Sequence, residues 1–145
     1  MFLVAMAIRI TESEFQHVLA LLRSMLVEAG LGKWEIDPWL AKAAARLAQN
    51  HQDGTGAYFL EYVDGSPVGM VGASLHDHHA FLSLKIQRYG CVVDAYVLPA
   101  HRRTGLEQQL RADAVAWIRQ AGAVVLDAPP PNVARLAAIS GGGKL

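Results

Sequence analysis

The chain has 145 residues, which suits one domain with a proper hydrophobic core and is too short for two. Apolar residues make up 52% of it and charged residues 18%, a composition that indicates a globular protein and excludes general disorder. The formal net charge is zero, so we expect neither nucleic acid nor a membrane surface as a partner. The single cysteine, Cys91, excludes an internal disulfide framework and favours a reducing compartment, the cytoplasm. We therefore expect one cytoplasmic domain over residues 1–145.

The N-terminal third predicts a strand followed by two helices. Residues 2–10 are rich in aliphatic and β-branched types, which favour a strand, and the run is too short to span a membrane. Residues 11–14 match a capping box, after which apolar residues at steps of three and four predict a helix that ends at Gly30. Asp37 as the cap and Pro38 as the first helical residue indicate a second helix, with an apolar face formed by Leu40, Ala43, Ala44, Leu47 and Ala48.

The middle of the chain predicts a β-hairpin. Residues 57–63 and 68–75 are strand-like and are separated by residues 64–67, whose Asp-Gly pair suits a tight turn. The structure of residues 76–88 stays open. Residues 76–79, with the sequence His-Asp-His-His, have metal-ligand types, but four consecutive residues of an extended segment cannot converge on one ion. We therefore predict a solvated loop there and no metal site.

The C-terminal part predicts alternating strands and helices. Residues 91–98 indicate a strand, and residues 123–126 a short apolar strand. Residues 105–121 indicate an amphipathic helix, with an inward apolar stripe formed by Leu106, Leu110, Ala114, Trp117 and Ile118. Asn132 can cap a last helix that ends at about residue 140. The order of elements predicts an α/β fold of the α+β type, in which a mixed, mostly antiparallel sheet is flanked by helices on both faces.

A strand, a basic glycine-containing turn and a helix start follow one another directly over residues 94–107. Amides at a helix N-terminus lack partners within the helix, and the helix dipole and nearby arginines add to their attraction for an anion. Pyrophosphate is therefore a natural ligand of this turn. The alternative is a solvated basic turn, formed by His101, Arg102 and Arg103 and capped by Gly105, with no ligand.

The same stretch resembles the core motif of the Gcn5-related N-acetyltransferase (GNAT) superfamily, V-x-P-x-x-[Q/R]-x-x-G-x-[G/A]. Val97, Pro99, Arg102 and Gly105 match the motif, and the order of elements extends the resemblance over most of the chain. The resemblance implies an acetyltransferase that moves an acetyl group from acetyl-CoA, as co-substrate, to an amine of an unidentified small molecule or peptide.

The resemblance also implies which residues contact acetyl-CoA. Backbone amides around Tyr96 and Val97 would face the thioester, and the turn that follows would hold the pyrophosphate. The implied cofactor-binding residues are Tyr96, Val97, Arg102, Arg103, Thr104, Gly105, Leu106, Glu107 and Asn132.

Two carboxylates are candidates for the catalytic base that takes the proton of the attacking amine. Asp94 is the first choice, because it lies on the strand that leads into the motif, and Glu61 on an earlier strand is the second. A free Asp has a pKa of about 3.9, so Asp94 would need burial or a bridging water to act. Its alternative role is to orient the substrate or simply to lie half-exposed in the strand.

Three features depart from the family's pattern. Glu107 stands where the family has a small residue, and Ile139 stands where the family commonly has a Tyr that protonates the leaving thiolate. The two strands that follow the last helix in the family have no counterpart in the sequence. A homodimer is expected to cover the strand edge that this would leave. These departures keep an alternative open: a catalytically degenerate module that binds acetyl-CoA or a second copy of the chain.

Overall fold

The computed structural model describes residues 8–79 and 86–126. Their elements in chain order are β1 (Ile8–Arg9), η1 (Glu12–Glu14), α1 (Phe15–Glu28), α2 (Lys33–Asp53), β2 (Gly56–Val63), β3 (Ser66–His79), β4 (Ile86–Val97), η2 (Pro99–His101), α3 (Leu106–Gln120) and β5 (Val124–Leu126). None of the helices among these residues has the length and apolar character that a membrane crossing requires.

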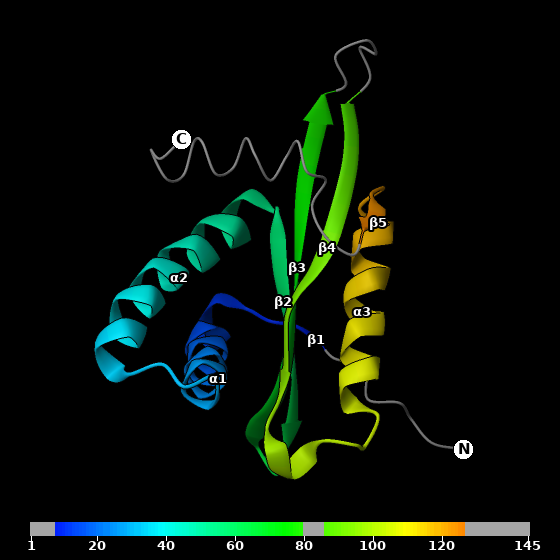
Figure 1. Ribbon diagram of the computed structural model, residues 1–145. Helices are drawn as coiled ribbons and strands as arrows, with labels where there is room; N and C mark the ends of the chain where they lie inside the picture. The colour runs from blue at the N-terminus through cyan, green and yellow to red at the C-terminus, as the bar shows by residue number, and fades with distance from the viewer. Residues whose placement is uncertain (1–7, 80–85, 127–145) are drawn as a thin grey trace.

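One five-stranded sheet forms the middle layer, in the order β1-β2-β3-β4-β5. Neighbouring strands are antiparallel from β1 to β4, whereas β4 and β5 are parallel. Helices α1 and α2 cover one face of the sheet and α3 covers the other (Figure 1). The predicted fold class, a mixed and mostly antiparallel sheet between helices on both faces, is confirmed.

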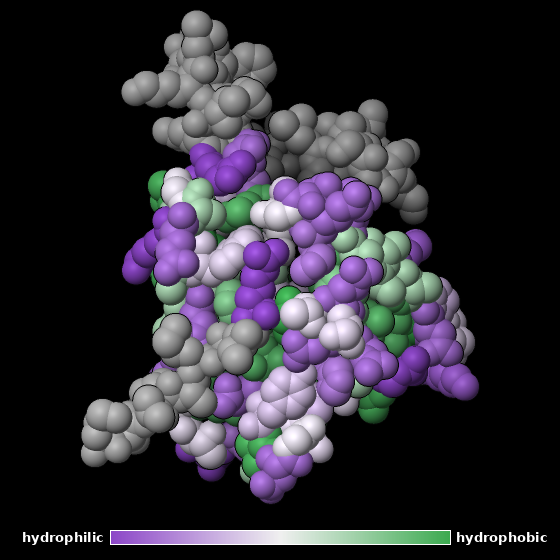
Figure 2. Space-filling view, turned by 180° about the vertical axis from the view of Figure 1, so that it is seen from behind, coloured by the Kyte–Doolittle hydropathy of each residue, from purple (hydrophilic) through white to green (hydrophobic). Residues whose placement is uncertain are grey.

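A separate hydrophobic core fills each side of the sheet. Under α3 the helix contributes Leu110, Ala114 and Ile118, which belong to the predicted apolar stripe. Under α1 and α2 the buried residues include Val18 and Leu47. The space-filling view is mainly hydrophilic, with hydrophobic residues scattered over it in small groups (Figure 2). Ala48, which the spacing placed on the apolar face of α2, is exposed, so that assignment is wrong.

The β2–β3 hairpin closes through a shorter turn than the sequence indicates. Val63 pairs with Ser66, so only Asp64 and Gly65 form the loop. Their φ angles are 51° and 80°, and two residues with positive φ are what a two-residue hairpin turn of type I′ requires. The predicted hairpin and its Asp-Gly turn are confirmed.

The start of α2 differs from the prediction. Gly32 is its N-cap, and the Glu35 Oε1 accepts a hydrogen bond from the Gly32 amide at 3.5 Å. Asp37 is therefore not a cap, and Pro38 lies inside the helix instead of at its first position. The Asp37 carboxylate is committed elsewhere: it pairs with Arg23 of α1, with Nη2 and Oδ1 2.8 Å apart. A contact between two helices thus replaces the local cap that the sequence suggested.

Strands β3 and β4 form a hairpin and are longer than the strands predicted at residues 68–75 and 91–98, because residues 76–79 and 86–90 continue them. The solvated loop predicted at residues 76–79 is wrong. Two cross-strand contacts stabilise the extension: an ion pair between Arg88 Nε and Asp77 Oδ1 at 2.9 Å, and stacked rings of His76 and Tyr89 with centroids 5.2 Å apart.

Several predictions concern residues outside the described part of the chain. They are the start of the first strand over residues 2–7, the helix that Asn132 would cap, the role of Ile139 and the absence of further strands at the C-terminus. Within the described residues β5 is the last strand.

Candidate active site

A β-bulge in β4 sets the geometry of the site. Met70 pairs with Tyr96 and Gly72 pairs with Val93, so two residues of β4, Asp94 and Ala95, oppose one residue of β3. Asp94 has a φ angle of 53°, in the left-handed region that non-glycine residues rarely adopt. A bulge bends its strand and redirects the side chains at that point.

The bulge decides which face of the sheet the Asp94 carboxylate reaches. Side chains alternate along a strand, so an inserted residue reverses the pattern beyond it. Val92 packs against the α3 core, whereas Tyr96, an even number of positions further on, belongs to the α1/α2 core. Asp94 reaches the α1/α2 face as well, where the Tyr58 hydroxyl donates a hydrogen bond to its Oδ2 over 2.5 Å.

Tyr58 presents this hydroxyl from β2, across β3. Burial, followed by the charge of Asp94, raises the pKa of Tyr58 well above its ordinary value, so the hydroxyl stays protonated and donates. Room for the ring comes from Gly72 of β3. A Cβ on Gly72 would lie 2.8 Å from Tyr58 Cε2 and 2.9 Å from Val93 Cγ2, too close for either contact. The absent side chain thus allows the Tyr58–Asp94 contact.

Two adjoining cavities lie beside this contact, with volumes of about 270 Å³ and 700 Å³. Helix α2 lines the smaller one with residues at helical spacing, from Trp39 to Asn50. His76 borders the larger one. The residues that line both are Arg46, Leu47, Asn50, Tyr58 and Asp94. The cavities therefore meet at the Asp94 carboxylate.

The second part of the site is the turn between β4 and α3. Arg103 and Gly105 have φ angles of 65° and 83°, and Gly105 is the N-cap of α3. No described backbone carbonyl accepts a hydrogen bond from the amides of residues 103–108, and the first amide that returns to the turn is that of Gln109, to the Gly105 carbonyl. Thr104 Oγ1 donates to the His101 carbonyl at 2.8 Å and stabilises the turn. Successive free amides of this kind form an anion-binding nest.

A hollow of about 440 Å³ lies at this turn. It is lined by Val97, His101, Arg102, Arg103, Gly105, Glu107 and Gln108. None of these residues lines the cavities at Asp94. The residues present suit a pyrophosphate, because free amides, the positive end of α3 and the Arg103 side chain meet here.

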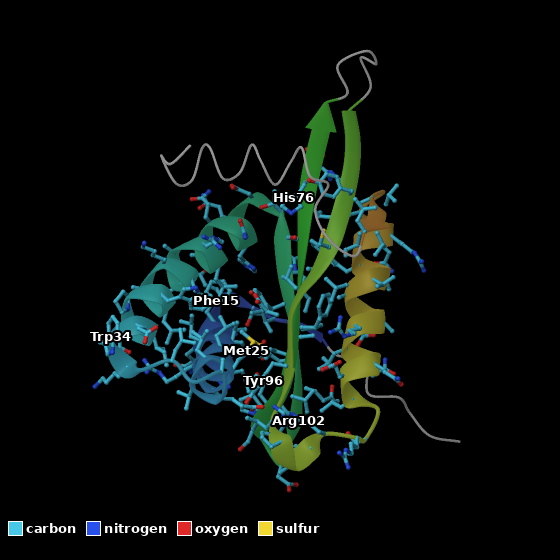
Figure 3. All side chains as sticks on the ribbon, in the orientation of Figure 1. Phe15, Met25, Trp34, His76, Tyr96 and Arg102 are labelled. Atoms are coloured by element: carbon cyan, nitrogen blue, oxygen red, sulfur yellow. The ribbon has the colours of Figure 1, made fainter. Side chains whose placement is uncertain are left out.

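Arg102 serves the turn differently from Arg103. Its Nε donates to the Val97 carbonyl at 2.9 Å, and its Nη2 pairs with Glu28 Oε1 at 2.8 Å. The same Glu28 oxygen accepts the Tyr96 hydroxyl at 2.9 Å. Tyr96 and Arg102 adjoin each other where β4 meets the turn (Figure 3). These bonds lower the pKa of Glu28, Arg102 first and Tyr96 second, and they tie the turn to the end of α1. The Arg102 guanidinium is thus occupied, and Arg103 makes no ion pair with any described residue.

Glu107, the residue that departs from the family's motif, is the second residue of α3. Its Oε2 pairs with Arg111 Nε, four residues on, at 3.3 Å. The ion pair draws the carboxylate along the helix toward its second turn, while the Glu107 amide stays in the nest. An acidic side chain in the first turn is also favoured by the helix dipole.

The structure does not bring the two predicted catalytic carboxylates together. Glu61 shares the face of Phe59 in β2 and lies near Asp113 of α3, on the opposite side of the sheet from Asp94. Burial and the charge of Asp113 raise the pKa of Glu61. Glu61 lines neither cavity at Asp94. Asn132 lies outside the described residues.

The sequence reasoning missed the residues that surround Asp94. Neighbouring residues of a strand face opposite sides of the sheet, and Phe59 of β2 faces α3. This alternation predicts that Tyr58 faces α1 and α2, as it does. Lys42 and Arg46, which line the smaller cavity, stand outside the predicted apolar face of α2 and carry no local signal for a site. The bulge at Asp94 has no signature in the sequence that we recognise.

Known proteins that resemble the chain share this fold. The model of the acetyltransferase (GNAT) family matches residues 19–139. No curated protein matches the sequence significantly. A GCN5-related N-acetyltransferase from Ralstonia eutropha JMP134 has a TM-score of 0.70 at 19% identity, covering 96% of this chain and 92% of that one. A predicted acetyltransferase with acetyl-CoA from Clostridium acetobutylicum also has a TM-score of 0.70, at 11% identity, covering 95% and 89%.

An aminoglycoside antibiotic 6'-N-acetyltransferase from Acinetobacter haemolyticus is similar over 95% of this chain and 90% of its own, with a TM-score of 0.61 at 21% identity. At these identities the structures show the fold, and the family model, which spans most of the chain, shows the family. The resemblance carried by the motif at Val97 to Gly105 and the predicted enzyme class are thereby confirmed. The chain belongs to the acetyltransferase (GNAT) family.

Proposed function

We propose that the protein transfers the acetyl group of acetyl-CoA to the amine of a small molecule or peptide. The observation that carries the proposal is the placement of two groups by one strand. β4 holds a carboxylate at its bulge, beside a cavity, and then leads directly into a turn with free amides. An acyl transfer from acetyl-CoA needs a base at the thioester and a separate pyrophosphate site at the other end of the donor's extended arm.

The turn is the proposed pyrophosphate site. The amides of residues 103–108 and the Arg103 side chain would hold the two phosphates, with the dipole of α3 adding to the attraction. Acetyl-CoA, when bound there, supplies a thioester as the acetyl donor. In the described residues β5 pairs with β4 only from Tyr89 to Cys91, so no described strand pairs with this edge of β4 beyond that point. Backbone groups of this edge, including those at Tyr96 and Val97, are available in the proposal to an extended ligand.

Asp94 is the proposed base. The nitrogen of the acceptor forms a bond to the carbonyl carbon, the carbon–sulfur bond breaks, and coenzyme A leaves as a thiolate, which becomes a thiol by taking up a proton from solvent. The proton that the nitrogen loses passes to Asp94, directly or through a water. The Tyr58 hydroxyl holds the carboxylate in position. Glu61 has no part in the proposal, because it lies on the other face of the sheet.

Two measurements test the proposal in sequence. Calorimetric titration with acetyl-CoA should show stoichiometric binding, and binding should weaken strongly when Arg103 is replaced by Glu. Arg119→Glu is the matched control, since Arg119 lies in the last turn of α3 and outside the hollow. Absence of acetyl-CoA binding would contradict the proposal.

Release of free thiol with a panel of amines then separates an enzyme from a degenerate binding module. We expect release above the rate of hydrolysis with at least one amine. Binding of acetyl-CoA without any amine-dependent release of thiol would favour the degenerate binding module. That alternative is open because Glu107 and Ile139 depart from the residues that the family commonly has at these positions.

The zero net charge and the single cysteine support a cytoplasmic location for the reaction. The homodimer expected from the sequence stays a prediction. Within the described part of the chain, β5 pairs on one side only, and its Val124 is 63% exposed. An exposed strand edge of this kind supports a second copy of the chain as the partner that covers it. Sedimentation velocity should give twice the monomer mass at micromolar concentration, and a monomer at that concentration would contradict the prediction.

A further inference from the structure

We propose that the acceptor carries an anionic group, a carboxylate or a phosphate, together with the amine that is acetylated. The inference rests on the proposed function and names the class of acceptor that the cavities at Asp94 would take. It arises from the charges of the lining side chains: Lys42 and Arg46 of α2 and Arg9 of β1 are cationic, and Asp94 is anionic.

The cationic wall is formed by α2. Lys42 and Arg46 are four residues apart and so lie on the same face of the helix, and both line the smaller cavity. Neither makes an ion pair with any residue in the described ranges, whereas Arg23 of α1 is neutralised by Asp37. Two unpaired cations beside a cavity are a natural site for an anionic group.

The anionic point is Asp94, which is the only acidic residue that lines either cavity among the described residues. An amine arrives at neutral pH as an ammonium ion, and the Asp94 carboxylate attracts it. The charge of Arg46 acts on the neighbouring Tyr58 hydroxyl, where it opposes the rise in the pKa of Tyr58. Arg46 therefore lies close to the Tyr58–Asp94 pair, and a small acceptor could contact both ends.

The size and surface of the cavities agree with a small molecule. The larger cavity, about 700 Å³, falls within the range of about 300–1,000 Å³ common for small-molecule sites, and the smaller one, about 270 Å³, lies just below it. Trp39 adds an aromatic surface and Asn50 an amide that can donate or accept a hydrogen bond.

The same charges disfavour polycationic acceptors. One of the similar structures is an aminoglycoside acetyltransferase. Aminoglycosides carry several ammonium groups. Such a ligand would bring further positive charge next to Lys42 and Arg46, and like charges in close contact lower affinity. We therefore expect this chain to differ from that neighbour in its acceptor.

The test compares amines that differ only in the anionic group. The pairs are 4-aminobutyrate with butylamine, and O-phosphoethanolamine with ethanolamine; kanamycin and spermidine represent polycations. We expect the member of at least one pair that carries the anionic group to have a kcat/KM at least tenfold above that of the member without it and above both polycations. The two pairs distinguish a carboxylate from a phosphate. A preference for the members without the anionic group or for the polycations would overturn the inference but leave the proposed transferase intact.

Variants of α2 locate the anion site. Arg46→Gln should raise the KM for the preferred anionic acceptor about tenfold or more, and Arg46→Lys should restore part of the loss. Lys33→Gln is the matched control, because Lys33 begins the same helix but lines neither cavity. Equal effects of Arg46→Gln and Lys33→Gln would overturn the assignment.

A binding measurement tests the inference without turnover. The protein is titrated with O-phosphoethanolamine and with 4-aminobutyrate while the Arg46 Nε–H resonance is followed. A saturable shift that Lys33→Gln retains supports the anion site even if no acetyl transfer occurs, in which case only the proposed function fails. No shift with either probe, together with no preference for anionic acceptors, would overturn the inference.

Discussion

The Asp94 carboxylate occupies a strained point of β4, with a positive φ angle, and is held there by the Tyr58 hydroxyl. A non-glycine residue with such a φ angle lowers the stability of the folded state by about 1–3 kcal/mol, and the conformation persists only where the surrounding structure holds it. The pairs on either side of the bulge, with Met70 and Gly72, supply those surroundings. The backbone is therefore held in a conformation that directs one carboxylate into a cavity, which a regular strand would turn toward α3.

Replacing Asp94 by Asn should lower kcat by about 100-fold or more, since general-base catalysis contributes about 10²–10⁴-fold. The affinity for acetyl-CoA should stay unchanged, because Asp94 does not line the hollow at the turn. Thiol-release kinetics and calorimetry measure the two quantities. Tyr58→Phe is the companion variant: it keeps the base but removes its hydrogen bond, so its kcat should fall less. Undiminished turnover in Asp94→Asn would contradict the role of this residue.

At the scale of elements, α1 is fastened at both ends by tyrosines of the sheet. The Tyr62 hydroxyl donates to Glu14 Oε2 at 2.5 Å just before α1, and the Tyr96 hydroxyl donates to Glu28 Oε1 at its last residue. Through Glu28 and Arg102 the same contact reaches the turn before α3. The position of α1 and the shape of the anion-binding turn are thus physically connected.

These contacts predict how stability depends on pH. Hydrogen bonds lower the pKa of Glu14, chiefly from Tyr62, and of Glu28, chiefly from Arg102, below the ordinary 4.5. The unfolded state therefore binds more protons than the folded state near pH 4. The stabilisation is present above about pH 4.5 and is lost as the pH falls through the lowered folded-state values. Melting temperatures between pH 7 and pH 3 should fall more steeply in the natural protein than in the Glu14→Gln/Glu28→Gln double variant, and equal slopes would contradict the prediction.

The contact between β4 and α3 depends on a glycine. A Cβ on Gly90 would lie 2.5 Å from Ile118 Cγ2 and 3.1 Å from the Ser74 carbonyl oxygen. Gly90→Ala should therefore lower the free energy of unfolding by about 1–3 kcal/mol, as overpacking of a core does. Chemical denaturation measures the change.

Ile118→Ala supplies the control for this effect, because it removes the side chain that the new methyl group would strike. The double variant Gly90→Ala/Ile118→Ala should be destabilised by less than the sum of the two single variants. Strict additivity would show that the clash with Ile118 is not the cause.

For the whole molecule, the sequence predicted the features that arise from local patterns. The four-residue spacing of Leu110, Ala114 and Ile118 placed α3 against the sheet, and Asp64 with Gly65 marked the β2–β3 turn. The motif from Val97 to Gly105 identified the family, because a phosphate-binding turn needs a particular short sequence. Each of these signals is contained within a few neighbouring residues.

Features that depend on partners far away in the chain were not predictable in this way. Asp37 has the residue type of a cap, but Arg23 on another helix claims its carboxylate. Glu61 and Asp94 were assigned to one site, yet alternation in β2 and the bulge in β4 send them to opposite faces of the sheet. Neither the bulge nor the helix–helix ion pair alters the local residue pattern, so the reasoning from pattern missed both.

The division of the site by β4 has a kinetic consequence. The cavities at Asp94 and the hollow at the turn share no lining residue, so the two proposed substrates would occupy separate positions and neither must leave before the other enters. Cys91 is buried, with 2% of its surface exposed, and is poorly placed to carry an acetyl group between them. Initial-rate plots against both substrates should therefore intersect, as for a ternary complex, and parallel lines would indicate an acetylated enzyme instead.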